Sequence, residues 1–90
     1  MDDKSFYNLL QTILLAARLM GYEIKEFQLS NVITYNFMKE NLTHVSLIVR
    51  FQDNREIKEV SVRKLGYTGI HSYCELDTYN QALSKTLELL

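Results

Sequence analysis

The chain lacks proline altogether and has only three glycines among its 90 residues, Gly21, Gly66 and Gly69. Linkers between domains are usually rich in glycine, serine or proline, and no such stretch, low-complexity run or internal repeat is visible. We therefore expect a single domain over residues 1–90. A domain of this size buries only about two-thirds of the surface of its unfolded chain, so we expect a small margin of stability.

Cysteine is almost absent as well, and the single Cys74 excludes an internal disulfide. The chain opens with Met1-Asp2-Asp3, which is acidic where a secretory signal peptide carries basic residues. The longest apolar run, Ile13–Ala17, is far shorter than the roughly 20 residues that cross a bilayer. The sequence therefore predicts a soluble, cytoplasmic protein with no membrane partner.

An excess of charge of either sign is also missing. Ten basic residues stand against eleven acidic ones, which leaves a net charge of −1. Such a chain has no overall field that would attract nucleic acid or an anionic membrane. Its hydrophobic content of 47% is sufficient for one core and argues against disorder.

The clearest pattern that is present is a β-hairpin between Thr43 and Lys64. Apolar residues alternate with polar ones as far as Phe51, the alternation breaks at Asp53-Asn54, and it resumes at Ile57. Alternation interrupted by such a pair is typical of two antiparallel strands with one buried face.

The register of this hairpin depends on the length of its turn. A two-residue turn at Asp53-Asn54 would leave Ile57 on the solvent side, unless a β-bulge turns its side chain inward. We favour the bulge. The two-residue turn also predicts two opposed pairs on the buried face, Val45 with Val62 and Leu47 with Val60.

Helical periodicity marks both ends of the chain. The first helix is expected from Asp3 or Lys4 to Met20, with Gly21 ending it, and the second is expected after Asp77 as N-cap. The first helix buries a stripe spaced by three and four residues, which comprises Phe6, Leu10, Ile13, Ala17 and Met20. The inner stripe of the second comprises Tyr79, Ala82, Leu83, Thr86, Leu87 and Leu90.

The apolar arc of the first helix is wider than one buried face requires, because Leu15 and Leu19 extend it. Two explanations stay open. The helix packs against a sheet and also under a loop, or these two leucines bury against another copy of the chain. Since self-association often supplements the core of a small domain, we name Leu15 and Leu19 as self-association residues of a homodimer.

Further strands are expected at Tyr22–Leu29 and Val32–Lys39, with a short one at His71–Glu75. In the first of these, Ile24 and either Phe27 or Leu29 are expected to face inward. The resulting order is α-β-β-β(-β)-α. It predicts an α+β two-layer sandwich in which both terminal helices pack on one face of an antiparallel sheet.

Residues that could carry catalysis or bind metal are few. His71 and Cys74 are three residues apart, which in a strand places their side chains on opposite faces. These residues and His44 include no closely spaced pair that would seat a zinc ion. No nucleophile elbow, phosphate loop or nucleotide fingerprint occurs. We predict a protein that is not an enzyme and has no cofactor, metal site or catalytic residue.

The order of elements is shared with the double-stranded-RNA-binding domain, but the residues are not. That family places a run of lysines at the start of its last helix, over the RNA phosphates. The corresponding stretch here, Leu76–Ala82, contains no basic residue. A nucleic-acid-binding regulator that uses a small basic group on the sheet is therefore only the second hypothesis, and it would use Arg50, Lys58, Arg63 and Lys64.

The leading hypothesis is a non-catalytic protein-binding module, a small regulator or inhibitor of the phage or mobile-element type, that occupies the surface of a partner protein. Tyrosine and arginine are enriched at interaction hot spots, and they gather after the hairpin. The expected contact residues are Arg63, Lys64, Tyr67, His71 and Tyr73. A small accessory subunit with a ligand pocket between sheet and helices is the third hypothesis.

Overall fold

The computed structural model describes residues 3–66, 69–75 and 78–90. Within them, the predicted α+β fold is confirmed. The sheet has five strands, one more than the predicted order contained. That order counted the two strands of the Thr43–Lys64 hairpin as one. The elements are α1 (Asp3–Leu19), β1 (Glu23–Leu29), β2 (Val32–Lys39), β3 (Leu42–Phe51), β4 (Ile57–Lys64), β5 (Ile70–Tyr73) and α2 (Tyr79–Leu89).

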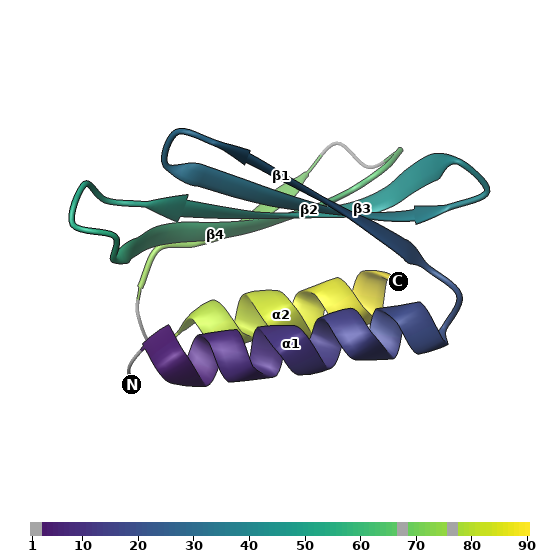
Figure 1. Cartoon of the computed structure of the whole chain (residues 1–90), viewed down its shortest axis with the longest axis horizontal. Helices are drawn as coiled ribbons and strands as arrows, with labels where there is room; N and C mark the ends of the chain where they lie inside the picture. The colour runs from purple at the N-terminus through teal and green to yellow at the C-terminus, as the bar shows by residue number, and fades with distance from the viewer. Residues whose placement is uncertain (1–2, 67–68, 76–77) are drawn as a thin grey trace.

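The strands form one antiparallel sheet in the order β1-β2-β3-β4-β5, so each strand pairs with its neighbours in the sequence. Both helices lie on the same face of this sheet, side by side and running in the same direction (Figure 1). At the start of each helix, the rings of Phe6 and Tyr79 meet edge to face with 6.2 Å between their centroids. Within the described residues, nothing packs on the opposite face, which we call the open face (Figure 1).

The stripe predicted for α1 is buried, except for Met20, which is 46% exposed. The helix ends at Leu19, and Gly21 turns the chain with a φ of +96°. The N–H groups of Gly21 and Tyr22 bond back to the carbonyls of Arg18 and Ala17, each at 3.0 Å, which is the Schellman arrangement. Because the chain leaves the helix there, Met20 does not follow the stripe.

In α2, the first four members of the predicted stripe are buried, and Leu87 is 40% exposed. Thr78 stands at the N-cap position, and Asp77 lies outside the described residues. The hydroxyl of Tyr79 donates a hydrogen bond of 3.0 Å to the carbonyl of Ile57 at the start of β4. This bond fastens the C-terminal helix to the sheet.

The predicted register of the β3–β4 hairpin is wrong by two residues. Val62 lies opposite Leu47 and Val60 opposite Val49. Asp53-Asn54 begins a longer loop rather than forming a complete turn, and Gln52 N–H closes that loop on the Glu56 carbonyl at 2.8 Å. A shift of two residues preserves the alternation of faces, so the predicted buried side chains remain correct.

The β-bulge that we favoured is confirmed. The register shifts between Arg50 and Phe51, and Ile57 faces inward with only 5% of its surface exposed. Beyond the bulge, Val60 and Val62 are fully buried beneath the helices. The bulge therefore allows both the first and the later apolar residues of β4 to join the core.

Candidate functional site

The register of the sheet sets which side chains share the open face. Phe27 pairs with Thr34, Thr34 with Ile48, Ile48 with Ser61, and Ser61 with Ser72. Paired residues of neighbouring strands point to the same side of a sheet. These five residues therefore form a row across the open face, apolar toward β1 and polar toward β5.

The apolar side of the open face begins on β1. Ile24 pairs with the buried Phe37 and faces the helices, as predicted. Phe27 and Leu29 lie an odd number of residues from Ile24, so the expectation that one of them faces inward is wrong. Their side chains are 55% and 80% exposed, and Val32 continues this apolar group on β2.

The polar side of the open face centres on Glu59. Its carboxylate pairs with Arg50 Nε at 3.1 Å and accepts hydrogen bonds from the Ser61 hydroxyl at 3.3 Å and the Cys74 thiol at 3.7 Å. The hydroxyls of Ser61 and Ser72 are also within 3.3 Å of each other. These groups satisfy one another and form a polar strip beside the apolar side chains.

His71 and Cys74 do not meet. His71 pairs with the buried Val62 and therefore points to the helix side, whereas the Cys74 thiol reaches Glu59 on the open face. The expected separation of these two side chains is confirmed. No thiol–imidazole pair is available for nucleophilic catalysis in this part of the chain.

The predicted contact residues are divided between the two faces of the sheet. Arg63 pairs with Ile70, and both side chains are on the open face. Lys64 pairs with the buried Val45, so it faces the helix side together with His71 and Tyr73. Tyr73 is half-buried and packs against the core, as a tyrosine that caps a core does. The remaining residue, Tyr67, lies outside the described residues.

The two predicted self-association residues lie on the exposed side of α1. Leu15 is 56% exposed and Leu19 is 81% exposed. The explanation that a loop covers them is therefore wrong for the described part of the chain. Both leucines are available for contact with another molecule.

The basic residues named for nucleic-acid binding do not form one group either. Arg50 is paired with Glu59, Arg63 stands on the open face, and Lys64 points to the helix side. Lys58 lies at the far end of β4, beside the β3–β4 loop. These four basic side chains therefore do not form one continuous basic strip.

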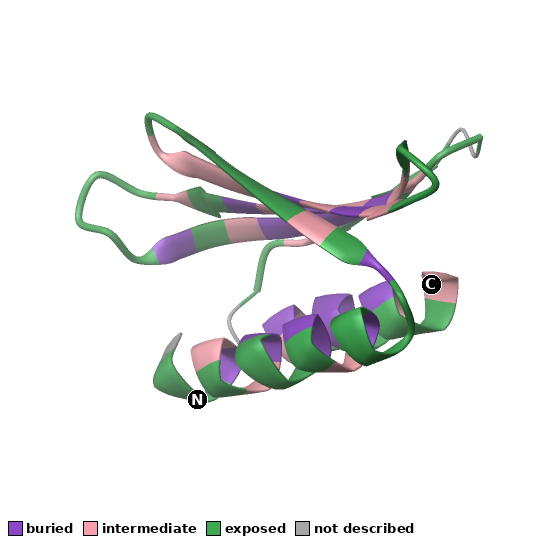
Figure 2. Ribbon diagram, turned by 45° about the vertical axis from the view of Figure 1, so that its right-hand side comes forward, coloured by how far each residue is buried: buried purple, intermediate pink, exposed green. Residues whose placement is uncertain are grey.

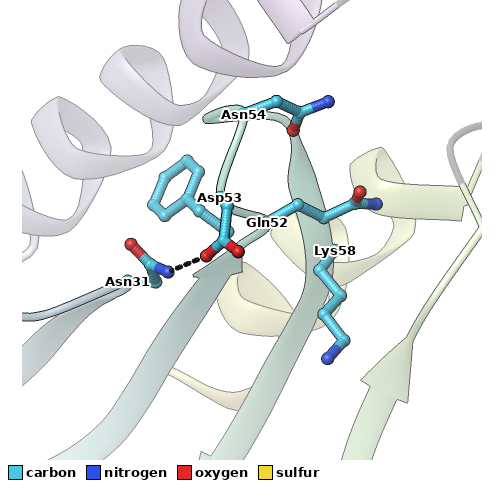
Figure 3. A pocket seen from close by; sticks show the side chains of 6 residues that line it. Asn31, Gln52, Asp53, Asn54 and Lys58 are labelled. Carbon is cyan, nitrogen blue, oxygen red and sulfur yellow. Dashed lines mark hydrogen bonds between the residues drawn. The ribbon is translucent and has the colours of Figure 1, made fainter.

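One depression, with a volume of about 550 Å³, opens at the end of the sheet where the β1–β2 turn meets the β3–β4 loop (Figure 3). The amide of Asn31 donates to the Asp53 carboxylate at 3.2 Å, and the Asn31 carbonyl accepts the Phe51 N–H at 2.8 Å. These bonds join the turn to the loop. A ligand pocket was expected between sheet and helices, and another depression, of about 340 Å³, does lie where Tyr73 of β5 meets α2.

Among the described residues, no three His, Cys, Asp or Glu side chains gather closely enough to hold a metal ion. None of the described helices is both long enough and apolar enough to cross a membrane. No protein-family model, curated protein or solved structure matches the chain. The open face of the sheet is therefore selected as the candidate site on its geometry and residues alone.

Proposed function

We propose that this chain is a non-catalytic protein-binding module, a small regulator or inhibitor that occupies the surface of a partner protein with the open face of its sheet. The observation that carries the proposal is the exposure of large apolar side chains on a face that no described element covers. Phe27 is 55% exposed, Leu29 80% and Ile70 56%.

A solvated sheet face normally carries polar residues at alternate positions. The open face departs from this rule on four of its five strands, at Phe27 and Leu29, Val32, Ile48 and Ile70. Contiguous apolar side chains bordered by polar ones are typical of protein–protein interaction sites. The partner is therefore expected to present an apolar surface to β1–β3.

The energetics are compatible with a specific complex. Complete burial of a Phe or Leu side chain contributes about 1.5–3 kcal/mol, so Phe27 and Leu29 together offset part of the entropic cost of association. The Arg50–Glu59 pair, which lies beside Val32, and the two serines of β4 and β5 already satisfy one another. A partner can cover them without leaving a charge unpaired.

The test begins with affinity capture of partners from the native host, followed by calorimetry with each purified candidate. Ile48→Lys places a charge near the middle of the open face and should weaken binding at least about tenfold. Leu19→Lys makes the same apolar-to-charged change at an exposed leucine of α1 and serves as the matched control. Equal affinity of wild type and Ile48→Lys for every purified candidate would refute the proposal.

Nucleic acid is the competing outcome of the same experiment. If duplex or single-stranded DNA or RNA binds at low salt, and added salt weakens that binding steeply, the electrostatic alternative holds instead.

A further inference from the structure

The free edge of β1 can be defined from hydrogen-bond alternation. The carbonyl of Asn31 accepts the N–H of Phe51, so odd-numbered residues at this end of β2 bond toward β3. In an antiparallel pair the bonding direction alternates along the strand, and even-numbered residues of β2 therefore bond to β1. Their partners on β1 are odd-numbered, as in the pairs of Leu29 with Val32 and Phe27 with Thr34.

The even-numbered residues of β1 therefore direct their backbone groups away from the sheet. These residues are Ile24, Glu26 and Gln28, and no described strand lies on the outer side of β1 to bond with their outward groups. Every residue of β1 except Ile24 is exposed, and Figure 2 shows this strand in front, green over most of its length. An uncovered edge of seven residues is a template for another strand. The opposite edge, β5, has only four residues.

We propose that β1 pairs antiparallel with β1 of a second copy, about a two-fold axis through Phe27, so that the two five-stranded sheets become continuous. In this register, Glu26 and Gln28 of each copy exchange backbone hydrogen bonds with Gln28 and Glu26 of the other. The two Phe27 rings meet on the open face as an adjacent aromatic pair.

The charges on β1 select this register from its neighbours. A two-fold axis perpendicular to the sheet must pass through a residue, because only then do paired side chains share a face. An axis through Lys25 would set the two lysines opposite each other, and one through Glu26 would do the same with two glutamates. Like charges directly opposite destabilise a sheet. With the axis at Phe27, Lys25 faces Leu29 of the second copy and Glu26 faces its Gln28, so no like charges lie directly opposite each other.

An axis through Gln28 would also avoid like charges, but it would pair only three residues of each strand. The axis through Phe27 pairs five residues, from Lys25 to Leu29, and is therefore the longest overlap without repulsion.

The position of Leu15 on α1 is compatible with this dimer. On α1, Phe6 contacts Tyr79 of α2, whereas Tyr7 lies close enough to Tyr35 of β2 to raise its pKa. Leu15 lies two turns beyond Tyr7, on the side of α1 away from α2. Because α1 contacts β1, pairing of the two β1 strands places both α1 helices on the same side of the joined sheet, with the sides that carry Leu15 turned toward each other. Dimerisation does not depend on the proposed function, since it uses the outward backbone groups of β1, although Phe27 and Leu29 of the open face then lie beside the joined edges.

Sedimentation equilibrium of the full chain tests the dimer. Wild type should be dimeric at tens of micromolar. Gln28→Pro removes an outward N–H and no bond to β2, which an edge strand tolerates, and it should weaken the dimer by about tenfold or more. Gln28→Ala keeps that N–H and should still dimerise. A strictly monomeric wild type, or equal association of the alanine and proline variants, would overturn the proposal.

Charge variants at the same position test the register and keep the test valid if the proline variant fails to fold. Gln28→Lys places an ammonium beside Glu26 of the second copy, and Gln28→Glu places a carboxylate there. The lysine variant should tighten the dimer and the glutamate variant should loosen it, each by about threefold to tenfold. If neither substitution changes the dissociation constant of the dimer, the interface lies elsewhere on the molecule. Loss of the dimer in Leu15→Glu with retention in Gln28→Pro would assign that interface to the helices instead.

The test of the dimer and the test of the proposed function can be distinguished, because different variants affect each. Ile48 lies two strands away from the β1 edge, so Ile48→Lys should leave sedimentation unchanged. Gln28→Pro should retain the affinity of a single open face for its partner.

Discussion

The phenol of Tyr35 should make the protein less stable in alkali. This side chain points toward the helices and is only 7% exposed. Burial raises its pKa from 10.0 to about 12, with further contributions from the negative charge of Glu26, from a hydrogen bond to that carboxylate and from Tyr7. The folded chain therefore retains a proton that the unfolded chain releases.

The sign of the effect follows from proton linkage. Below about pH 10 the phenol is protonated in both states, and its contribution to stability is fully present. As the pH rises from about 10 toward 12, the unfolded state loses the proton first, so the free energy of unfolding falls. A shift of two pKa units corresponds to roughly 2–3 kcal/mol in total, of which about 2 kcal/mol should be lost by pH 11.5.

Urea titrations of wild type and Tyr35→Phe from about pH 8 to 11.5, at one protein concentration, measure this term. Near pH 8, wild type should be the more stable by about 1 kcal/mol, because the variant lacks the hydrogen bond to Glu26. Near pH 11.5 that order should be reversed. Other tyrosines and the lysines titrate in both proteins and cancel in the difference. Parallel pH profiles for the two proteins would refute the buried phenol as the cause.

Further substitutions test the fold by urea denaturation. Tyr79→Phe removes the hydroxyl that holds Ile57 and should cost about 1–2 kcal/mol, whereas no change would mean that this bond does not fasten α2. Leu83→Ala empties a fully buried position and should cost about 2–5 kcal/mol, and a smaller loss would argue against a packed core there. Gly21→Ala should cost about 1 kcal/mol because of the φ of +96°, and a neutral result would exclude that backbone conformation. Leu19→Ser should stay within about 0.5 kcal/mol of wild type.

Much of the fold was predictable because periodicity reports which side of an element is buried. The bounds predicted for Val32–Lys39 agree with β2, and the alternation of Tyr35 and Phe37 with polar neighbours places the buried face correctly. The β3–β4 register was not predictable in the same way. It depends on the length of the loop after Phe51, in which Arg55 adopts a φ of 72°. The alternation of apolar and polar residues does not indicate how long such a loop is.

The open face was harder to predict than the core. In Glu23–Leu29 both faces of the strand mix charged and apolar residues, so the alternation does not indicate which side the helices cover. Only the pairing of Ile24 with Phe37 decides that Phe27 points outward. The contact residues chosen from the sequence were neighbours along the chain, and alternation then divided Arg63 from Lys64.

The size of the layers explains why one face stays open. Helices pack about 10 Å apart, so two of them span roughly the width of four strands spaced by about 4.8 Å. Both α1 and α2 are therefore needed to cover one side of the five-stranded sheet, and neither can cover the other side. Any cover for Phe27, Ile48 and Ile70 must come from outside the described residues.

Pairing of two β1 edges extends the sheet but adds nothing above it, so it joins two open faces into one surface. The edge and the face therefore need different partners, a second copy for the first and another protein for the second.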